Sequence, residues 1–267
     1  MGNRLENRLL RTTLLVSVVL VGSKFTGFLR DVALAYSFGT SMQADAFVLA
    51  QSVQTIFSYL LFVALGIAFI PVYTKLKLEE DPTQVCDFIH TTYSVAGTVI
   101  AAFCVLGFCF ADGLVFLLAP GFPEEAHWLG VWLTRITLPA VFFTFLSTIQ
   151  GQQLRAENQF LPSAFIAYPL NLCLVFALIF LSPLWGIQVA AYAYVLGSLL
   201  QVLLLWPFVR RTGYRFHYHF DLKNPGLRRV MALTLPIMLG NTLQAIDTPK
   251  AKIGVLICYD VEFPEAV

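Results

Sequence analysis

The chain has 267 residues, of which 58% are hydrophobic and only 12% are charged, and its mean hydropathy is +0.74. Soluble domains carry about twice that share of charged residues, so the composition indicates a protein whose solvent is a lipid bilayer. The net charge of +1 comes from basic residues scattered over separate connections, which excludes the basic patch of a nucleic-acid-binding protein.

The first apolar stretch begins at Thr12 and contains the ionisable residues Lys24, Arg30 and Asp31 toward its end. It is long enough for a membrane-spanning helix of roughly 20 residues, and its length and Lys24 favour an uncleaved anchor over a signal peptide. Ionisable groups within a span usually face a protein interior or a water-filled cavity, so they are functional candidates. Lys24 and Asp31 share one helix face and Arg30 lies about a third of a turn away, so the three side chains can line one polar chamber. A second interpretation stays open, in which Arg30 and Asp31 mark the helix end at the interface and Lys24 pairs with another helix.

Five further apolar runs follow. The second, Ala46 to Thr74, has 29 uncharged residues and accommodates one tilted span with its flanks. The third runs from Thr91 to Ala111, and the fourth, from His127 to Leu154, contains one charge. From Asn158 to Val209 there are 52 consecutive uncharged residues, about 78 Å of helix and therefore two crossings. The last run, Val230 to Ile246, has 17 residues. We therefore expect an all-α, polytopic membrane protein with about seven transmembrane helices.

Lysine and arginine residues fall in alternate connections between these spans. The connections at about 37–44, 119–126 and 182–187 contain none, and the third of these holds a proline and a glycine that are expected to break the helix. By the positive-inside rule, the basic connections and the N-terminus are predicted to be cytoplasmic. The basic residues of the remaining connections are Lys75, Lys77, Arg155, Arg210, Arg211, Arg215, Lys223, Arg228 and Arg229.

Several short segments support a family assignment in combination. They are SKFTGFLRD at 23–31, FGT at 38–40, ADAF at 44–47, FIPVY at 69–73, LAPGF at 118–122 and LTRITLP at 133–139, with Gly151 and Asn171. Over about residues 5–247 the chain resembles the MurJ (MviN) lipid II flippases.

The resemblance implies a member of the multidrug/oligosaccharidyl-lipid/polysaccharide exporter superfamily, built from two lobes around a cationic cavity. Such a protein is a transporter, not an enzyme, and needs no cofactor or metal. It moves the undecaprenyl-diphosphate-linked peptidoglycan precursor across the bacterial cytoplasmic membrane by alternating access. Its partners would be that lipid-linked diphosphate, the bilayer and a C-terminal lobe, with no nucleic acid. In the family, basic residues of the first helix bind the diphosphate. Lys24 stands where an arginine is common, and Arg30, Asp31 and Asp45 match the pattern.

One departure concerns the second helix, where many family members carry an Arg-Arg pair. The corresponding region here, residues 55–59, reads TIFSY and has no charge. Fewer cations are then available to meet a diphosphate. A flippase for other polyprenyl-linked oligosaccharides, or a drug antiporter of the same superfamily, therefore stays open as an alternative.

The sequence changes character after the transmembrane lobe assigned to residues 1–247. Within 248–267, the short β-branched run at 253–257 has strand character. It is followed by CYDVEFPE, and residues 250–267 resemble the nucleophile segment of the nitrilase (carbon–nitrogen hydrolase) superfamily. That resemblance would make Cys258 a thiolate nucleophile. The triad also needs a glutamate and a lysine from separate strands, which nothing earlier in the chain supplies, so we expect no active site. We interpret the tail as a fusion. An amidohydrolase fragment that uses Cys258, and a non-functional chimera, also stay open.

Overall fold

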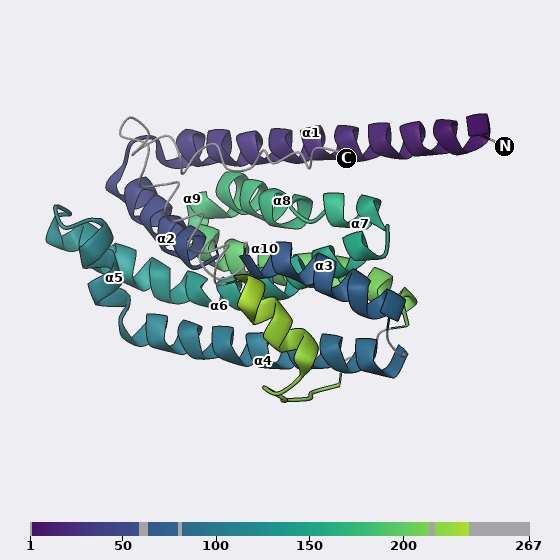
Figure 1. Cartoon of the computed structure of the whole chain (residues 1–267). Coiled ribbons are helices and arrows are strands. Elements are labelled where there is room, and N and C mark those ends of the chain that lie inside the picture. Colours follow the sequence, from purple (N-terminus) through teal and green to yellow (C-terminus); the bar gives the residue numbers. More distant parts are fainter. Residues whose placement is uncertain (1, 59–63, 80–81, 214–216, 235–267) are drawn as a thin grey trace, which may run out of the picture.

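The computed structural model describes residues 2–58, 64–79, 82–213 and 217–234, and all the regular elements in these ranges are helices. Figure 1 shows them as a bundle in which the long helices α1, α4 and α6 run roughly along one direction. The predicted all-α class is confirmed. The elements are α1 (Gly2–Phe38), α2 (Met42–Ser58), α3 (Ala64–Glu79), α4 (Pro82–Cys109), α5 (Ala111–Leu118), α6 (Glu124–Ala156), α7 (Phe160–Ala164), α8 (Tyr168–Phe176), the π-helical η2 (Ala177–Leu181), α9 (Ser182–Trp185) and α10 (Gln188–Arg211), followed by a helix at 225–234.

Five stretches among the described residues are long and apolar enough to cross a membrane: Leu10–Phe38, Thr83–Cys109, Glu124–Ala156, Phe160–Trp185 and Gln188–Arg211. The chain is thus a polytopic membrane protein, and the prediction of two crossings from the long uncharged run is confirmed. The predicted second span corresponds to α2 and α3, which at 17 and 16 residues are each short for a crossing, and the residues that join them lie outside the described ranges. Only the beginning of the predicted seventh span is described.

The turn between the fifth and sixth spans lies at Gly186, and at Pro183 the π-helical η2 gives way to a new helix, α9, so the predicted interruption at these two residues is present. Pro183 occupies the first turn of α9, where a helix needs no hydrogen bond from the backbone nitrogen. Gly186 adopts a φ of +70°, which a residue without a Cβ reaches at little cost. Trp185 is 70% exposed beside this turn, as is typical of an aromatic residue at a membrane interface.

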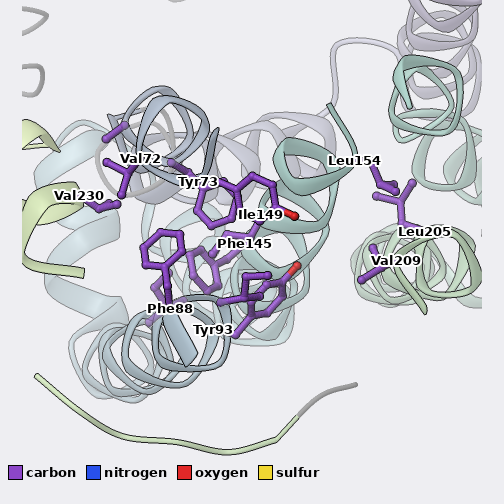
Figure 2. Close-up of a cluster of buried hydrophobic side chains, with 14 of the residues drawn as sticks. Val72, Tyr73, Phe88, Tyr93, Phe145, Ile149, Leu154, Leu205, Val209 and Val230 are labelled. Atoms are coloured by element: carbon purple, nitrogen blue, oxygen red, sulfur yellow. The ribbon is translucent and has the colours of Figure 1, made fainter. Parts of the chain in front are cut away.

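The helix α6 lies at the centre of the bundle and has buried side chains along its whole length. The largest hydrophobic cluster joins α6 to α3, α4 and α10, and Figure 2 shows part of it. Phe145 and Ile149 of α6 are almost fully buried there, and Phe69 of α3 stacks on Phe88 of α4 with ring centroids 5.5 Å apart. A second cluster joins α1, α2, α6, α8 and α10. These two clusters fix the positions of all the long helices around α6.

The helix α1 lies at the edge of the bundle and packs against α7, α8 and η2 (Figure 1). Only 6% of the residues in its most apolar stretch, within Leu10–Phe38, are buried. Leu14, Val18 and Val21 are each about two-thirds exposed, at 65%, 68% and 70%. One face of α1 is therefore held by the bundle, whereas its other faces are open.

The basic connections lie together at one end of the bundle. Lys77 Nζ at the end of α3 is 2.6 Å from the carboxylate of Glu157 beyond α6, and Gln153 Nε2 of α6 donates to Thr212 Oγ1 beyond α10 at 3.5 Å. The ends of α3, α6 and α10 are therefore neighbours, as the alternation of charge in the sequence requires.

Candidate functional site

Arg30 and Asp31, in the C-terminal third of α1, form an ion pair on the open side of the bundle. Arg30 donates from Nε at 2.9 Å and from Nη2 at 2.8 Å, both to Asp31 Oδ1. The side chain of Arg30 is 28% exposed and that of Asp31 is 65% exposed. An ion pair with this exposure is worth at most about 1 kcal/mol, so the guanidinium is available to a stronger anion.

Asn171 of α8 positions the arginine from the buried side. Its Oδ1 lies 3.4 Å from Arg30 Nη1, and its Nδ2 donates to Thr26 Oγ1 at 3.2 Å. The hydroxyl of Thr26 in turn donates to Ser23 O at 2.8 Å, one turn back along α1. Asn171 is only 5% exposed, and a buried amide of this kind is stable only when it is hydrogen-bonded. The chain of bonds therefore fixes the face that α1 turns to α8.

The other two predicted residues lie apart from this pair. Lys24 is exposed on α1, almost two turns before Arg30. Asp45 lies in the first turn of α2 and is also exposed. The structure thus brings together Arg30 and Asp31 of the four predicted residues, while Lys24 and Asp45 stay at separate positions on the two helices. In the second helix, Thr55 and Ile56 are exposed and provide no cation.

A further cation lies inside the bundle, on α6. The guanidinium of Arg135 is 5.5 Å from the centroid of the Phe108 ring of α4. Its Nε is buried without a hydrogen-bond partner among the described residues. A cation over an aromatic face is stabilised by the ring quadrupole, which gives this intramembrane charge a structural partner.

A polar cluster joins α3 to the α6–α7 turn at the basic end. Both carboxylate oxygens of Glu157 lie 2.6 Å from Lys77 Nζ, and the hydroxyl of Tyr73 donates to the same carboxylate. Burial raises the pKa of Glu157, but the hydrogen bonds from Lys77 and Tyr73 outweigh burial and hold that pKa below its ordinary value. The carboxylate is therefore charged near neutral pH.

The chemistry of these groups is that of ion binding. Within the described ranges, no three His, Cys, Asp or Glu side chains come together as a metal centre. Arg30 has a planar guanidinium that suits carboxylate or phosphate oxygens, and it is held at one side by Asn171 and exposed at the other. The arrangement can bind an anion at membrane depth.

Comparison with known proteins identifies the family. The family model described as "Lipid II flippase MurJ" matches residues 34–248. The chain belongs to the MurJ family. Among curated relatives, a "Probable lipid II flippase MurJ" of Buchnera aphidicola subsp. Acyrthosiphon pisum is 29% identical over 247 residues, covering 90% of this chain and 48% of the relative. A "Lipid II flippase MurJ" of Burkholderia cenocepacia is 28% identical over 237 residues, covering 85% of this chain and 46% of the relative.

Solved structures show the same fold for this MurJ-family chain. A lipid II flippase MurJ in an inward closed conformation superposes with a TM-score of 0.71 at 22% identity, covering 88% of this chain and 50% of that chain. An outward-facing multidrug resistance MATE family transporter of the MOP superfamily superposes with a TM-score of 0.67 at 18% identity, covering 87% of this chain and 53% of that chain. The chain spans about half the length of the relatives that it matches.

The nitrilase-like tail lies outside the described residues, and the matched family region stops at residue 248. The assignment of Cys258 as a nucleophile therefore stays a prediction. The same holds for the boundary between a lobe at 1–247 and a tail at 248–267.

Sequence reasoning missed the residues that position the candidate site. Asn171 belongs to the motifs that carry the family resemblance, but its role next to Arg30 was not predicted. The available signal was an asparagine in the interior of the long uncharged run, since an amide in a lipid-crossing helix needs a partner. The cluster of Tyr73, Lys77 and Glu157 had no signal beyond the charges in two connections.

Proposed function

We propose that this MurJ-family chain forms the N-terminal half of a flippase that moves an undecaprenyl-diphosphate-linked peptidoglycan precursor across the bacterial cytoplasmic membrane. The family match over residues 34–248 is the observation that carries this proposal. The relatives named as lipid II flippases are about twice as long, so the proposal includes a C-terminal lobe as the partner of this half. The N-terminus and the basic end of the bundle are proposed to be cytoplasmic, in accordance with the positive-inside rule.

In this proposal the open side of α1 faces the transport cavity, and Arg30 binds the diphosphate. A diphosphate cannot cross hydrocarbon unaided, because an unpaired charge there costs many kcal/mol. A fixed guanidinium lowers that barrier, and its planar donors match phosphate oxygens. The position of Arg30, one side bonded to Asn171 and the other exposed, supports this role.

Asp31 is proposed to hold Arg30 when no substrate is present. The exposed ion pair between them has a small free energy, whereas a diphosphate carries more charge than one carboxylate and accepts from several donors. The substrate would therefore displace Asp31 at low cost. Lys24, almost two turns away along α1, is proposed to meet the substrate at another level of the cavity, and Asp45 to lie near the outer end of α2.

A drug exporter of the same superfamily is the second candidate. One observation favours keeping it, the absence of arginine from residues 55–59. The TM-scores of 0.71 with the lipid II flippase and 0.67 with the multidrug transporter do not separate the two candidates. Identities of 22% and 18% show the fold alone. The proposed substrate therefore depends on the sequence family and on Arg30.

Complementation separates these candidates. A bacterial strain depleted of its lipid II flippase is given this chain, alone or joined to the C-terminal half of the Burkholderia cenocepacia relative. We expect growth to be restored by the joined protein and lost with Arg30→Ala. Arg11→Ala, a charge loss at the exposed start of the same helix, serves as the matched control. Failure of the joined protein at normal membrane levels would contradict the flippase proposal, and drug resistance without rescue would support the second candidate.

A further inference from the structure

A groove of about 320 Å³ lies between α3 and the helix 225–234, at the basic end of the bundle. A space of this size is at the lower end of the range for ligand pockets. The surface that lines the groove is almost entirely apolar, and two of its six residues, Lys75 and Arg229, carry a cation beyond their aliphatic stems. The groove is lined by Pro71, Val72 and Lys75 of α3 and by Arg229, Ala232 and Leu233 of the facing helix.

The helix 225–234, which forms one wall of the groove, is held firmly in place. Asn224 caps the helix 225–234, because its Oδ1 accepts from the backbone nitrogens of Gly226 at 2.9 Å and Leu227 at 3.2 Å. Gly226 packs so closely that a Cβ there would lie 2.6 Å from a ring carbon of Phe88 and 3.0 Å from a methyl of Leu76. The start of the helix is thus held against α3 and α4, as Figure 1 also shows.

In both helices that line the groove, the basic residue and the apolar residues lie at different heights along the helix axis. The helix α3 runs toward the basic end of the bundle and the helix 225–234 runs away from it. Lys75 follows Pro71 by one turn and Arg229 precedes Leu233 by one turn, about 6 Å in each case. Both cations are exposed. They therefore lie at the rim of the groove, and the apolar lining continues from them toward the middle of the bundle.

We propose that this groove binds an anionic phospholipid, with the phosphodiester between Lys75 and Arg229 and an acyl chain along the apolar lining. Basic pockets between helices on the cytoplasmic side of membrane proteins bind lipid head groups in this way. A soluble anion would gain nothing from the apolar lining, and a neutral lipid would gain nothing from two cations.

The neighbouring carboxylate of Glu79 leaves Lys75 available to bind a phosphodiester. Its Nζ lies 3.8 Å from Glu79 Oε2, and both side chains are more than half exposed, at 56% and 59%. Such an exposed pair contributes little, so Lys75 can turn from Glu79 to a phosphodiester. The proposed lipid site lies at the basic end and uses neither Arg30 nor Asp31, so it does not depend on the proposed flippase function.

Native mass spectrometry of the purified chain in a neutral detergent tests the proposal. The protein is titrated with phosphatidylglycerol or with phosphatidylcholine of the same acyl chains. We expect phosphatidylglycerol to bind at least ten-fold more tightly. Lys75→Gln and Arg229→Gln should each weaken phosphatidylglycerol binding about five-fold, the contribution of one surface cation near an anionic lipid, and should leave phosphatidylcholine binding unchanged.

The matched control is Arg228→Gln, the same charge change one residue away and outside the groove lining. It should keep phosphatidylglycerol affinity within about two-fold, because only cations beside the head group contribute strongly. Excess inorganic phosphate should fail to displace the lipid. Equal affinity for the two lipids in the unmodified chain, displacement by phosphate, or an equal loss in the control would each overturn the proposal. The comparison of lipids in the unmodified chain stands even if a variant folds poorly.

Discussion

Replacing Glu157 with glutamine tests how the end of α3 is joined to the α6–α7 turn. The carboxylate accepts from Lys77 at 2.6 Å on both oxygens and from the Tyr73 hydroxyl, and its side chain is only 17% exposed. Lys77 is 50% exposed, so its ion pair is screened and contributes up to about 1 kcal/mol. Glutamine can still accept from Tyr73, but the bond loses its charge assistance, a further loss of about 1 kcal/mol.

We therefore expect Glu157→Gln to lower the free energy of unfolding by about 1–2 kcal/mol. The measurement is unfolding of the purified chain in mixed micelles with a rising fraction of sodium dodecyl sulfate, followed by far-UV circular dichroism. Lys75→Gln is the matched control. Its partner Glu79 is 3.8 Å away and both are exposed, so its loss should stay below about 0.5 kcal/mol.

A double-mutant cycle between Lys77→Gln and Glu157→Gln measures the interaction free energy between these two side chains. Residues in direct contact couple by about 0.5 kcal/mol or more. The pH dependence gives an independent check. The folded pKa of Glu157 is held below its ordinary value of 4.5, so its contribution is present above that value and is lost as the pH falls through the folded pKa. A coupling near zero, or equal effects of Glu157→Gln and Lys75→Gln, would refute this reasoning.

Two further predictions concern the packing of α8. Gly197→Val should destabilise the chain by about 1–3 kcal/mol, because a Cβ at Gly197 would lie 2.7 Å from the Cα of Leu170. Gly113→Val is the control, because a Cβ at Gly113 would meet no atom within 4 Å. Similar losses of stability in both variants would contradict the argument. Tyr168→Phe should cost about 0.5–1.5 kcal/mol in the same unfolding assay, since its hydroxyl donates to Val19 O at 2.8 Å, and an unchanged transition would show that this bond does not hold α1 against α8.

The membrane architecture was predictable because lipid imposes a length on every crossing helix. The 52-residue uncharged run at 158–209 had to cross twice, and the structure divides it into two spans. The alternation of basic connections also predicted which helix ends lie together, as the contact of Lys77 with Glu157 shows. The position of the break was predictable as well, since Pro183 lies where a new helix begins and Gly186 ends that helix with a φ of +70°.

The candidate site was predictable only in part. Arg30 and Asp31 were identified because charge within an apolar run is costly and rare. The partner Asn171 is 141 residues away in the sequence, and no local pattern indicates which helix packs on α1. Likewise, the groove between α3 and the helix 225–234 arises from the packing of Gly226 on Phe88 and Leu76. Sequence periodicity describes one helix at a time, whereas these sites depend on pairs of helices.

The most direct test of the proposed function is the affinity of the purified chain for an undecaprenyl-diphosphate-linked precursor, measured by native mass spectrometry. We predict that Arg30→Gln weakens binding at least ten-fold, the loss of one charge-assisted hydrogen bond or more, and that Arg30→Lys restores it only in part. Arg11→Gln, at the exposed start of α1, should bind as the unmodified chain does. Unchanged affinity in Arg30→Gln, or an equal loss in Arg11→Gln, would contradict the assignment of Arg30 to the diphosphate.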